Sequence, residues 1–187
     1  MAVTTLDPKT ALVVIDLQQG IVALPTAHPV EQVVRNASLL ADAFRSQRLP
    51  VALVTVSGAP SGRTERARPT GERPAGWADL VPELNHQPHD QTFVKRTWGA
   101  FRDTGLEQYL RNLHVTQVVI AGVSTSIAVE STARHAHECG FNVTLAVDAM
   151  TDTDMDAHLN SITRIFPRLG ETGTTAQIIG LLGGTHG

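Results

Sequence analysis

Residues 118–134 constrain the fold of this chain more than any other stretch. They open with an apolar run, Val-Val-Ile-Ala-Gly-Val, without alternating polar side chains. Such a run is typical of a strand that is buried on both faces, as in a parallel sheet. We expect Gly122 to allow a tight exit from the strand, and Thr125 or Ser126 to cap a following helix. The first backbone N–H groups of that helix should point at whatever occupies the turn.

Apolar runs and amphipathic segments alternate along the rest of the chain. Strands are expected over residues 11–17, 51–56, 91–95, 117–121 and 142–147, and helices over residues 30–48 and 106–112. Parallel strands need a crossover connection, which a helix usually provides. The sequence therefore predicts an α/β fold, with a mostly parallel sheet of five or six strands and helices on both faces.

Composition limits the classes of protein to which the chain could belong. With 187 residues and 42% hydrophobic content, residues 1–187 are expected to form a single domain. The net charge of −3 gives no reason to expect nucleic acid or a membrane as partner. We expect a cytoplasmic protein, since no run spans a bilayer and the N-terminus lacks a signal-peptide layout. The single cysteine, Cys139, excludes an intrachain disulfide and a cysteine-cluster metal site.

Residues 57–89 interrupt the alternation of strands and helices. The segment contains several prolines together with Arg63, Arg66, Arg68 and Arg73, so one regular element is not expected. A long irregular insertion in an α/β domain is either a lid or binding loop, or a solvated surface loop. The sequence leaves both alternatives open.

Chemistry in an open parallel sheet gathers at the carboxyl ends of the strands. Asp16 lies near the end of the first expected strand, where a carboxylate after an apolar run is partly desolvated. Lys95 ends the third expected strand, and Ala128 lies in the first turn of the helix after Gly122. Each residue has a structural alternative, because Asp16 could cap a helix and Lys95 could be an exposed strand end.

Three motifs carry a resemblance to a known family. They are Val-Ile-Asp-Leu-Gln around Asp16, Val-Lys-Arg-Thr-Trp-Gly-Ala-Phe around Lys95, and Ala-Gly-Val-Ser-Thr-Ser-Ile-Ala-Val-Glu-Ser-Thr-Ala-Arg around Ala128. In this order they resemble the isochorismatase-like hydrolases, a superfamily that includes nicotinamidases and N-carbamoylsarcosine amidase. The resemblance runs from about Thr10 to Val147 and implies a Rossmann-like fold of three layers.

One departure from the family pattern decides which chemistry the resemblance implies. Most members have a catalytic Asp, Lys and Cys, and the corresponding residues here are Asp16, Lys95 and Ala128. An alanine cannot form the thioester on which the amide-cleaving members depend. The Asp-x-His metal motif of nicotinamidases is also missing after the second expected strand. No metal and no other cofactor is therefore expected.

True isochorismatases also lack the cysteine, because they hydrolyse a vinyl ether. That reaction needs a proton donor, a stabilised oxocarbenium ion and water, but no protein nucleophile. The resemblance implies that Asp16 protonates the enol carbon of a small organic substrate, while Lys95 orients Asp16 or binds a substrate carboxylate. Burial raises the pKa of a carboxyl group and a nearby ammonium lowers it. The sequence does not decide which effect is larger.

The resemblance also assigns the surroundings of this site. It implies a cis peptide between Val123 and Ser124, which together with Ala128 directs backbone N–H groups at the substrate. Trp98 is expected to pack either against a substrate ring or in the core. The other expected pocket residues are Gln18, Phe101 and Thr125.

Two alternative functions stay open. The chain could be a cysteine amidohydrolase with an inactivating alanine at position 128, or a non-catalytic protein that binds a small molecule or forms an oligomer. Family habit implies a homodimer or homotetramer. Cys139 is not expected to replace the missing nucleophile, because it lies eleven residues after Ala128, about 16 Å further along a helix. We interpret Cys139 as a buried apolar residue before a helix-ending glycine.

Overall fold

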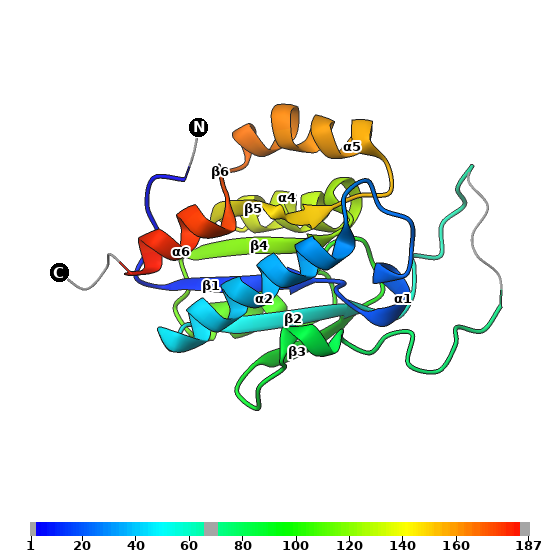
Figure 1. Ribbon diagram of the computed structural model, residues 1–187, viewed down its shortest axis with the longest axis horizontal. Helices are drawn as coiled ribbons and strands as arrows, with labels where there is room; N and C mark the ends of the chain where they lie inside the picture. Colours follow the sequence, from blue (N-terminus) through cyan, green and yellow to red (C-terminus); the bar gives the residue numbers. More distant parts are fainter. Residues whose placement is uncertain (1–2, 66–70, 184–187) are drawn as a thin grey trace.

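The computed structural model describes residues 3–65 and 71–183, which form a three-layer α/β fold (Figure 1). The strands are β1 (Thr10–Ile15), β2 (Val51–Val56), β3 (Gln91–Lys95), β4 (Gln117–Val123), β5 (Asn142–Thr151) and β6 (Glu171–Gly173). They form one sheet in the order β3-β2-β1-β4-β5-β6, and every neighbouring pair is parallel. The predicted α/β fold with a parallel sheet is confirmed.

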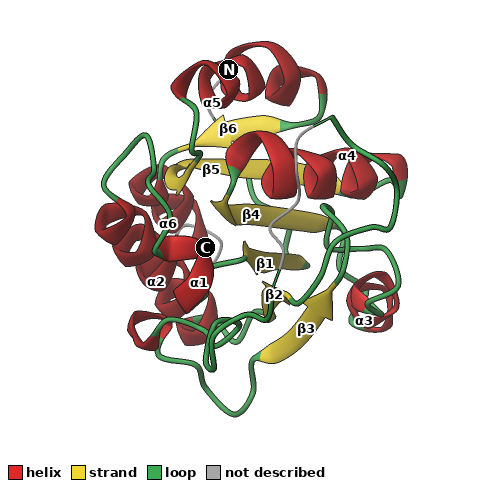
Figure 2. Ribbon diagram, turned by 90° about the vertical axis from the view of Figure 1, so that its right-hand side faces the viewer, coloured by secondary structure: helices red, strands yellow, loops and turns green. Residues whose placement is uncertain are grey.

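Helices cover both faces of this sheet. The α-helices are α1 (Gln19–Val22), α2 (Val30–Ser46), α3 (Leu106–Asn112), α4 (Glu130–Glu138), α5 (Met155–Asn160) and α6 (Thr175–Gly183). Shorter helical turns are η1 (Pro82–Leu84), η2 (Thr125–Val129), η3 (Ser161–Ile165) and η4 (Phe166–Arg168). In Figure 2, α2 and α6 lie on one side of the sheet, and α3 and α4 lie on the other.

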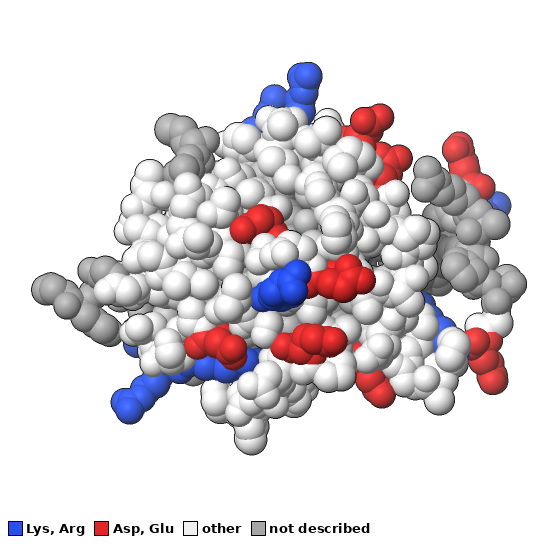
Figure 3. Space-filling model, viewed as in Figure 1, with Lys and Arg blue, Asp and Glu red and all other residues white. Residues whose placement is uncertain are grey.

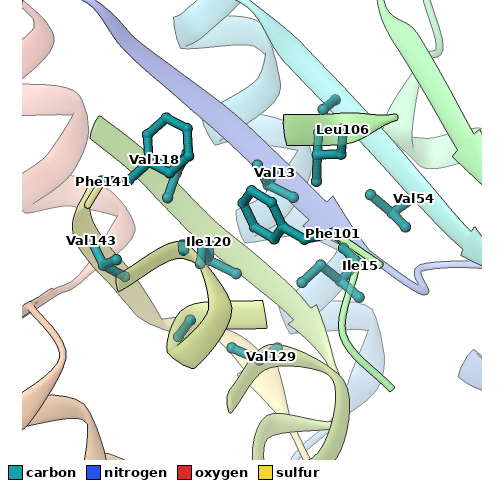
Figure 4. Packing of buried hydrophobic residues seen from close by; sticks show 14 of the residues in the cluster. Val13, Ile15, Val54, Phe101, Leu106, Val118, Ile120, Val129, Phe141 and Val143 are labelled. Atoms are coloured by element: carbon teal, nitrogen blue, oxygen red, sulfur yellow. The ribbon is translucent and has the colours of Figure 1, made fainter. Parts of the chain in front are cut away.

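Alternate residues of β1 enter two separate cores, because successive side chains of a strand point to opposite faces. Val13 and Ile15 pack with residues of α3 and α4 (Figure 4). Leu12 and Val14 pack with residues of α2 and α6. All six residues of β1 are buried. Burial on both faces explains why the sequence shows continuous apolar runs in its strands.

Left-handed backbone conformations end two elements earlier than their apolar patterns predict. The strand expected to reach residue 17 ends at Ile15, because Asp16 follows it with a φ of 56°. The helix expected to reach residue 48 ends at Ser46, and Arg48 also has a φ of 56°. At β1 this change of direction starts the turn that carries the Asp16 side chain.

Gly122 lies within β4, and not at the exit from the strand as expected. Its φ of 129° is a conformation that favours glycine, and a Cβ atom there would lie 2.0 Å from the Ile15 carbonyl oxygen. Glycine therefore allows β4 and β1 to approach closely where both strands end. β5 runs to Thr151, beyond its expected end, through a shift in register against β4 next to Gly122.

The irregular segment 57–89 contains one short helical turn, η1, within its described part. Two of its arginines, Arg66 and Arg68, lie outside the described residues.

Acidic and basic side chains are interspersed on the face of the molecule shown in Figure 3. No helix in the described part of the chain is long and apolar enough to cross a membrane.

Candidate active site

The carboxyl ends of β1 and β3 bring Asp16 and Lys95 together over the end of β2. Lys95 Nζ lies 2.7 Å from Asp16 Oδ2, and the two side chains are 2% and 5% exposed. Lys95 Nζ also donates a hydrogen bond to the Thr97 carbonyl at 3.2 Å. Asp16 therefore does not cap a helix, and Lys95 is not an exposed strand end. The structure places a buried, charge-assisted pair at the edge of the sheet where chemistry is expected.

The Asp16 carboxyl group has an unusual electrostatic environment. Burial raises the pKa of Asp16 from 3.8 to about 6, although the charge and hydrogen bond of Lys95 lower it. Its other oxygen, Oδ1, is buried and has no hydrogen-bond partner among the described residues. Burial thus outweighs the neighbouring ammonium. A carboxyl group in this state can hold a proton near neutral pH and deliver it to a substrate.

The turn between β4 and α4 forms another wall of the site. The peptide bond between Val123 and Ser124 is cis. The carbonyl of Ser124, directly before η2, accepts hydrogen bonds from the N–H groups of Ala128 at 2.9 Å and Val129 at 3.1 Å. These N–H groups therefore bond back to the turn. The expected role of Val123, Ser124 and Ala128 in directing N–H groups at a substrate stays a prediction, and the Ala128 N–H group is bonded within the turn.

Neither Thr125 nor Ser126 caps the helix in the expected way. Thr125 Oγ1 is buried and lies 2.8 Å from His158 Nδ1. The N–H and hydroxyl groups of Ser126 both donate to Asp152 Oδ2, at 2.7 and 2.8 Å. The carboxylate that stabilises this helix start thus comes from the residue after β5. No local capping pattern could have identified it, because Asp152 is distant in the sequence.

A cavity of about 520 Å³ opens above the Asp16–Lys95 pair. Of the predicted site residues, those that line it are Asp16, Lys95, Trp98, Val123, Ser124 and Ala128. The Ala128 side chain is almost fully buried, whereas Trp98 is 58% exposed. Core packing of Trp98 is thereby excluded, and its contact with a substrate ring stays a prediction.

Three predicted pocket residues, Gln18, Phe101 and Thr125, do not line this cavity. Gln18 is buried and holds β2, because its side chain donates to the Val56 carbonyl at 3.1 Å and accepts from the Val56 N–H at 2.7 Å. Phe101 belongs to the core (Figure 4), where its ring stacks on His135 at 5.2 Å between centroids. Each lies close in sequence to a site residue, but its side chain points into the protein.

Arg73 and Trp77 are among the residues of the cavity wall that sequence reasoning does not assign to the site. The guanidinium carbon of Arg73 lies 3.8 Å from the centroid of the Trp77 ring, a cation–π contact. A Cβ atom on Gly20 would lie 2.0 Å from this ring, so glycine there makes room for Trp77. The arginines and prolines of segment 57–89 were the only sequence feature that pointed to a binding loop here. Its described part supports the binding-loop alternative.

Cys139 directly follows α4, at the end of this helix that lies away from Ala128. It is half-buried, and not fully buried as expected. Gly140 follows with a φ of 80°, as predicted for a residue after a helix end. Burial raises the pKa of the Cys139 thiol, and the Glu107 carboxylate adds to this effect. A raised pKa disfavours the thiolate, in agreement with the prediction that Cys139 is not a nucleophile.

Comparison with known proteins relates this site to a family. A model of the isochorismatase domain matches residues 10–177. The isochorismatase family protein YwoC of Bacillus subtilis is 40% identical over 178 residues, which cover 91% of this chain and 93% of that protein. Enterobactin synthase component B of Escherichia coli is 26% identical over 179 residues, which cover 91% of this chain and 62% of that protein.

Solved structures show the same relationship. An isochorismatase family protein from Burkholderia thailandensis matches with a TM-score of 0.92 and 39% identity, covering 96% of this chain and 98% of that one. N-carbamoylsarcosine amidase from Thermoplasma acidophilum shares the fold, with a TM-score of 0.74 and 23% identity over 89% of this chain and 96% of that one. This chain therefore belongs to the isochorismatase family of hydrolases.

Proposed function

We propose that this hydrolase cleaves a vinyl ether in a small organic molecule, with Asp16 as general acid and without a covalent intermediate. The observation that carries the proposal is Asp16 Oδ1, which is buried beside the cavity and lacks a partner in the described part of the chain. A pKa of about 6 leaves roughly a tenth of these carboxyl groups protonated at pH 7. That fraction is ample for a general acid.

Hydrolysis of a vinyl ether requires only the Asp16 proton and one water molecule. Asp16 gives its proton to the terminal carbon of the double bond, and the ether oxygen stabilises the resulting oxocarbenium ion. Water adds to the cationic carbon, and the hemiketal then breaks into an alcohol and a ketone. The proton that water releases returns to Asp16. Lys95 holds Oδ2, whereas Oδ1 has no partner among the described residues, and the Lys95 charge stabilises the carboxylate formed in the first step.

Ala128 supports a route without a protein nucleophile. Its side chain lines the same cavity as Asp16 and Lys95, so a methyl group occupies this part of the wall. Amide hydrolysis in two steps requires a nucleophile that alanine does not provide. A vinyl ether requires only protonation and water.

Turnover of enolpyruvyl ethers, isochorismate among them, tests the proposal. Hydrolysis of such an ether releases pyruvate, which lactate dehydrogenase reports through NADH absorbance. We expect pyruvate release by the parent protein and its loss in Asp16→Asn. Asp156→Asn, an exposed carboxylate on α5, serves as the matched control and should keep full activity. Equal turnover in Asp16→Asn and the parent would rule out the proposed acid.

The position of Ala128 beside Asp16 and Lys95 also favours a second candidate, a cysteine amidohydrolase with an inactivating alanine. One relative is streptothricin hydrolase of Streptomyces noursei, 33% identical over 149 residues, which cover 79% of this chain and 51% of that protein. Ala128→Cys tests this candidate against a panel of amides and carbamoyl compounds. Hydrolysis that appears only with the cysteine supports the amidohydrolase.

A non-catalytic binding protein is the remaining alternative, and tight binding of a metabolite without turnover would support it. We also infer that residues 1–187 form one domain, since the family model spans all six described strands of the sheet. Family habit supports a homodimer or homotetramer. Analytical ultracentrifugation tests the oligomeric state, and a single monomeric species would contradict it.

A further inference from the structure

Away from the active site, α3 and the end of α4 bring three metal-binding side chains together. The donor atoms of Glu107, His135 and Cys139 all lie within 4.8 Å of one another. No other such group of three occurs among residues 3–65 and 71–183. All three side chains are half-buried, and none of them lines the active-site cavity.

Helix geometry places two of these donors side by side. His135 and Cys139 are four residues apart, and side chains with this spacing lie on the same face of a helix. Glu107 reaches them from the first turn of α3. Arg111 also joins the two helices, because its guanidinium donates to the Cys139 carbonyl. The fold itself thus brings the three donors together.

Neighbouring side chains hold two of the donors in place. The His135 ring stacks on Phe101 at 5.2 Å, with an angle of 20° between the planes. Arg111 lies 3.4 Å from Glu107 Oε1, and its guanidinium also covers the Phe141 ring at 4.2 Å. Aromatic rings therefore pack beside the cluster. An apolar surround and restrained ligands are common features of metal sites in proteins.

We propose that Glu107, His135 and Cys139 form a binding site for a divalent transition metal ion, best suited to Zn²⁺. Zinc takes thiolate, imidazole and carboxylate ligands in tetrahedral geometry, and three protein ligands leave the fourth position to water. Ligand atoms around tetrahedral zinc lie about 3.5 Å apart. The present separations need small side-chain rotations to reach this value. A single cysteine excludes a cysteine cluster, but it does not exclude this mixed set of ligands.

Co²⁺ titration of the metal-free, tag-free protein tests this site, because cobalt bound to a thiolate gives a charge-transfer absorption band. We expect one equivalent of Co²⁺ to bind with this band and Zn²⁺ to displace it. Cys139→Ser should abolish the band. His135→Ala and Glu107→Gln should weaken binding by at least about 10- to 100-fold, the loss typical of changes around a metal site. His137→Ala, an exposed histidine on the same helix, should bind like the parent.

A measurement on the parent protein makes the test independent of whether these variants fold. Cys139 is the only cysteine of the chain, so its alkylation by iodoacetamide is read directly by mass spectrometry. Bound Zn²⁺ should slow this alkylation at least tenfold. Equal alkylation rates with and without Zn²⁺, or the absence of a thiolate band, would overturn the proposal. Equal weakening by His135→Ala and His137→Ala would overturn it as well.

Discussion

Two buried carboxylates bind basic side chains at the same distance, but in different ways. Asp16 Oδ2 lies 2.7 Å from Lys95, and Asp90 Oδ2 lies 2.7 Å from Arg45. Both Asp90 oxygens accept hydrogen bonds, since Arg45 Nε binds Oδ1 and the Gln87 N–H binds Oδ2. Asp16 leaves Oδ1 without a partner in the described structure. A carboxylate with both oxygens bonded stabilises the fold, whereas a buried free oxygen beside a cavity is available for chemistry.

The two pairs also lie at opposite ends of the parallel strands. Asp90 directly precedes β3, and it ties that strand to Arg45 near the end of α2. Asp16 directly follows β1. In parallel sheets, sites of chemistry gather at the carboxyl ends of the strands. Position in the fold therefore agrees with hydrogen bonding in separating a structural pair from a candidate catalytic one.

Removal of the Asp16 carboxyl should have the largest effect on activity. We expect Asp16→Asn to lower kcat by about 10²- to 10⁴-fold, because a positioned general acid contributes this much. Steady-state pyruvate release under saturating substrate measures kcat. A loss of less than about tenfold would place Asp16 with Asp90, among the structural carboxylates.

Removal of the Asp90 carboxyl should instead affect stability. Asp90→Ala leaves the Arg45 guanidinium buried without its main partner, and we expect a loss of about 3 kcal/mol in the free energy of unfolding. Urea denaturation measures this quantity. Asp42→Ala is the matched control, because it removes only the exposed partner of Arg45 and should cost less than about 1 kcal/mol. Equal losses in the two variants would contradict the structural role of Asp90.

The Asp16–Lys95 pair should show strong coupling when both charges are removed. Lys95→Met leaves a buried carboxyl without its ammonium, and Asp16→Asn leaves a buried ammonium without its carboxylate. The double variant leaves neither, so we expect it to be about 1 to 3 kcal/mol more stable than the sum of the single effects predicts. Urea denaturation of the four proteins at pH 7 gives this coupling. Additive effects would mean that the two groups do not interact.

Activity should fall as pH rises through the pKa of Asp16. The protonated form donates the proton, and its fraction declines above a pKa of about 6. We therefore expect kcat/KM to fall by about tenfold per pH unit above that value. A rate that rises with pH over this range would indicate that Asp16 acts as a base.

The main elements and the Asp16–Lys95 pair, the candidate catalytic pair, could be predicted from the sequence because they depend on local patterns. The bounds of β2, β3 and α3 match their predicted ranges, since their apolar patterns begin and end where the elements do. Asp16 and Lys95 were identifiable because each follows or ends an apolar run, and parallel strands bring such ends together.

Contacts between distant segments explain what could not be predicted. The place of Trp77 in the cavity depends on the space beside Gly20, which no local pattern reveals. Asp152, the residue after β5, supports the start of the turn after β4, although it lies 26 residues from Ser126 in the sequence. Phe101 was misplaced because it is the last residue of a site motif, whereas its ring belongs to the core.

The most direct test of Asp16 as an acid is its own titration. Selective ¹³C labelling of aspartate carboxyl groups allows the pKa of Asp16 to be followed by NMR, with Asp16→Asn to assign the signal. We expect a midpoint near pH 6, because burial outweighs the charge of Lys95. A midpoint at or below the ordinary value of 3.8 would show that Asp16 is a permanently charged partner of Lys95, and would contradict general acid catalysis by this residue.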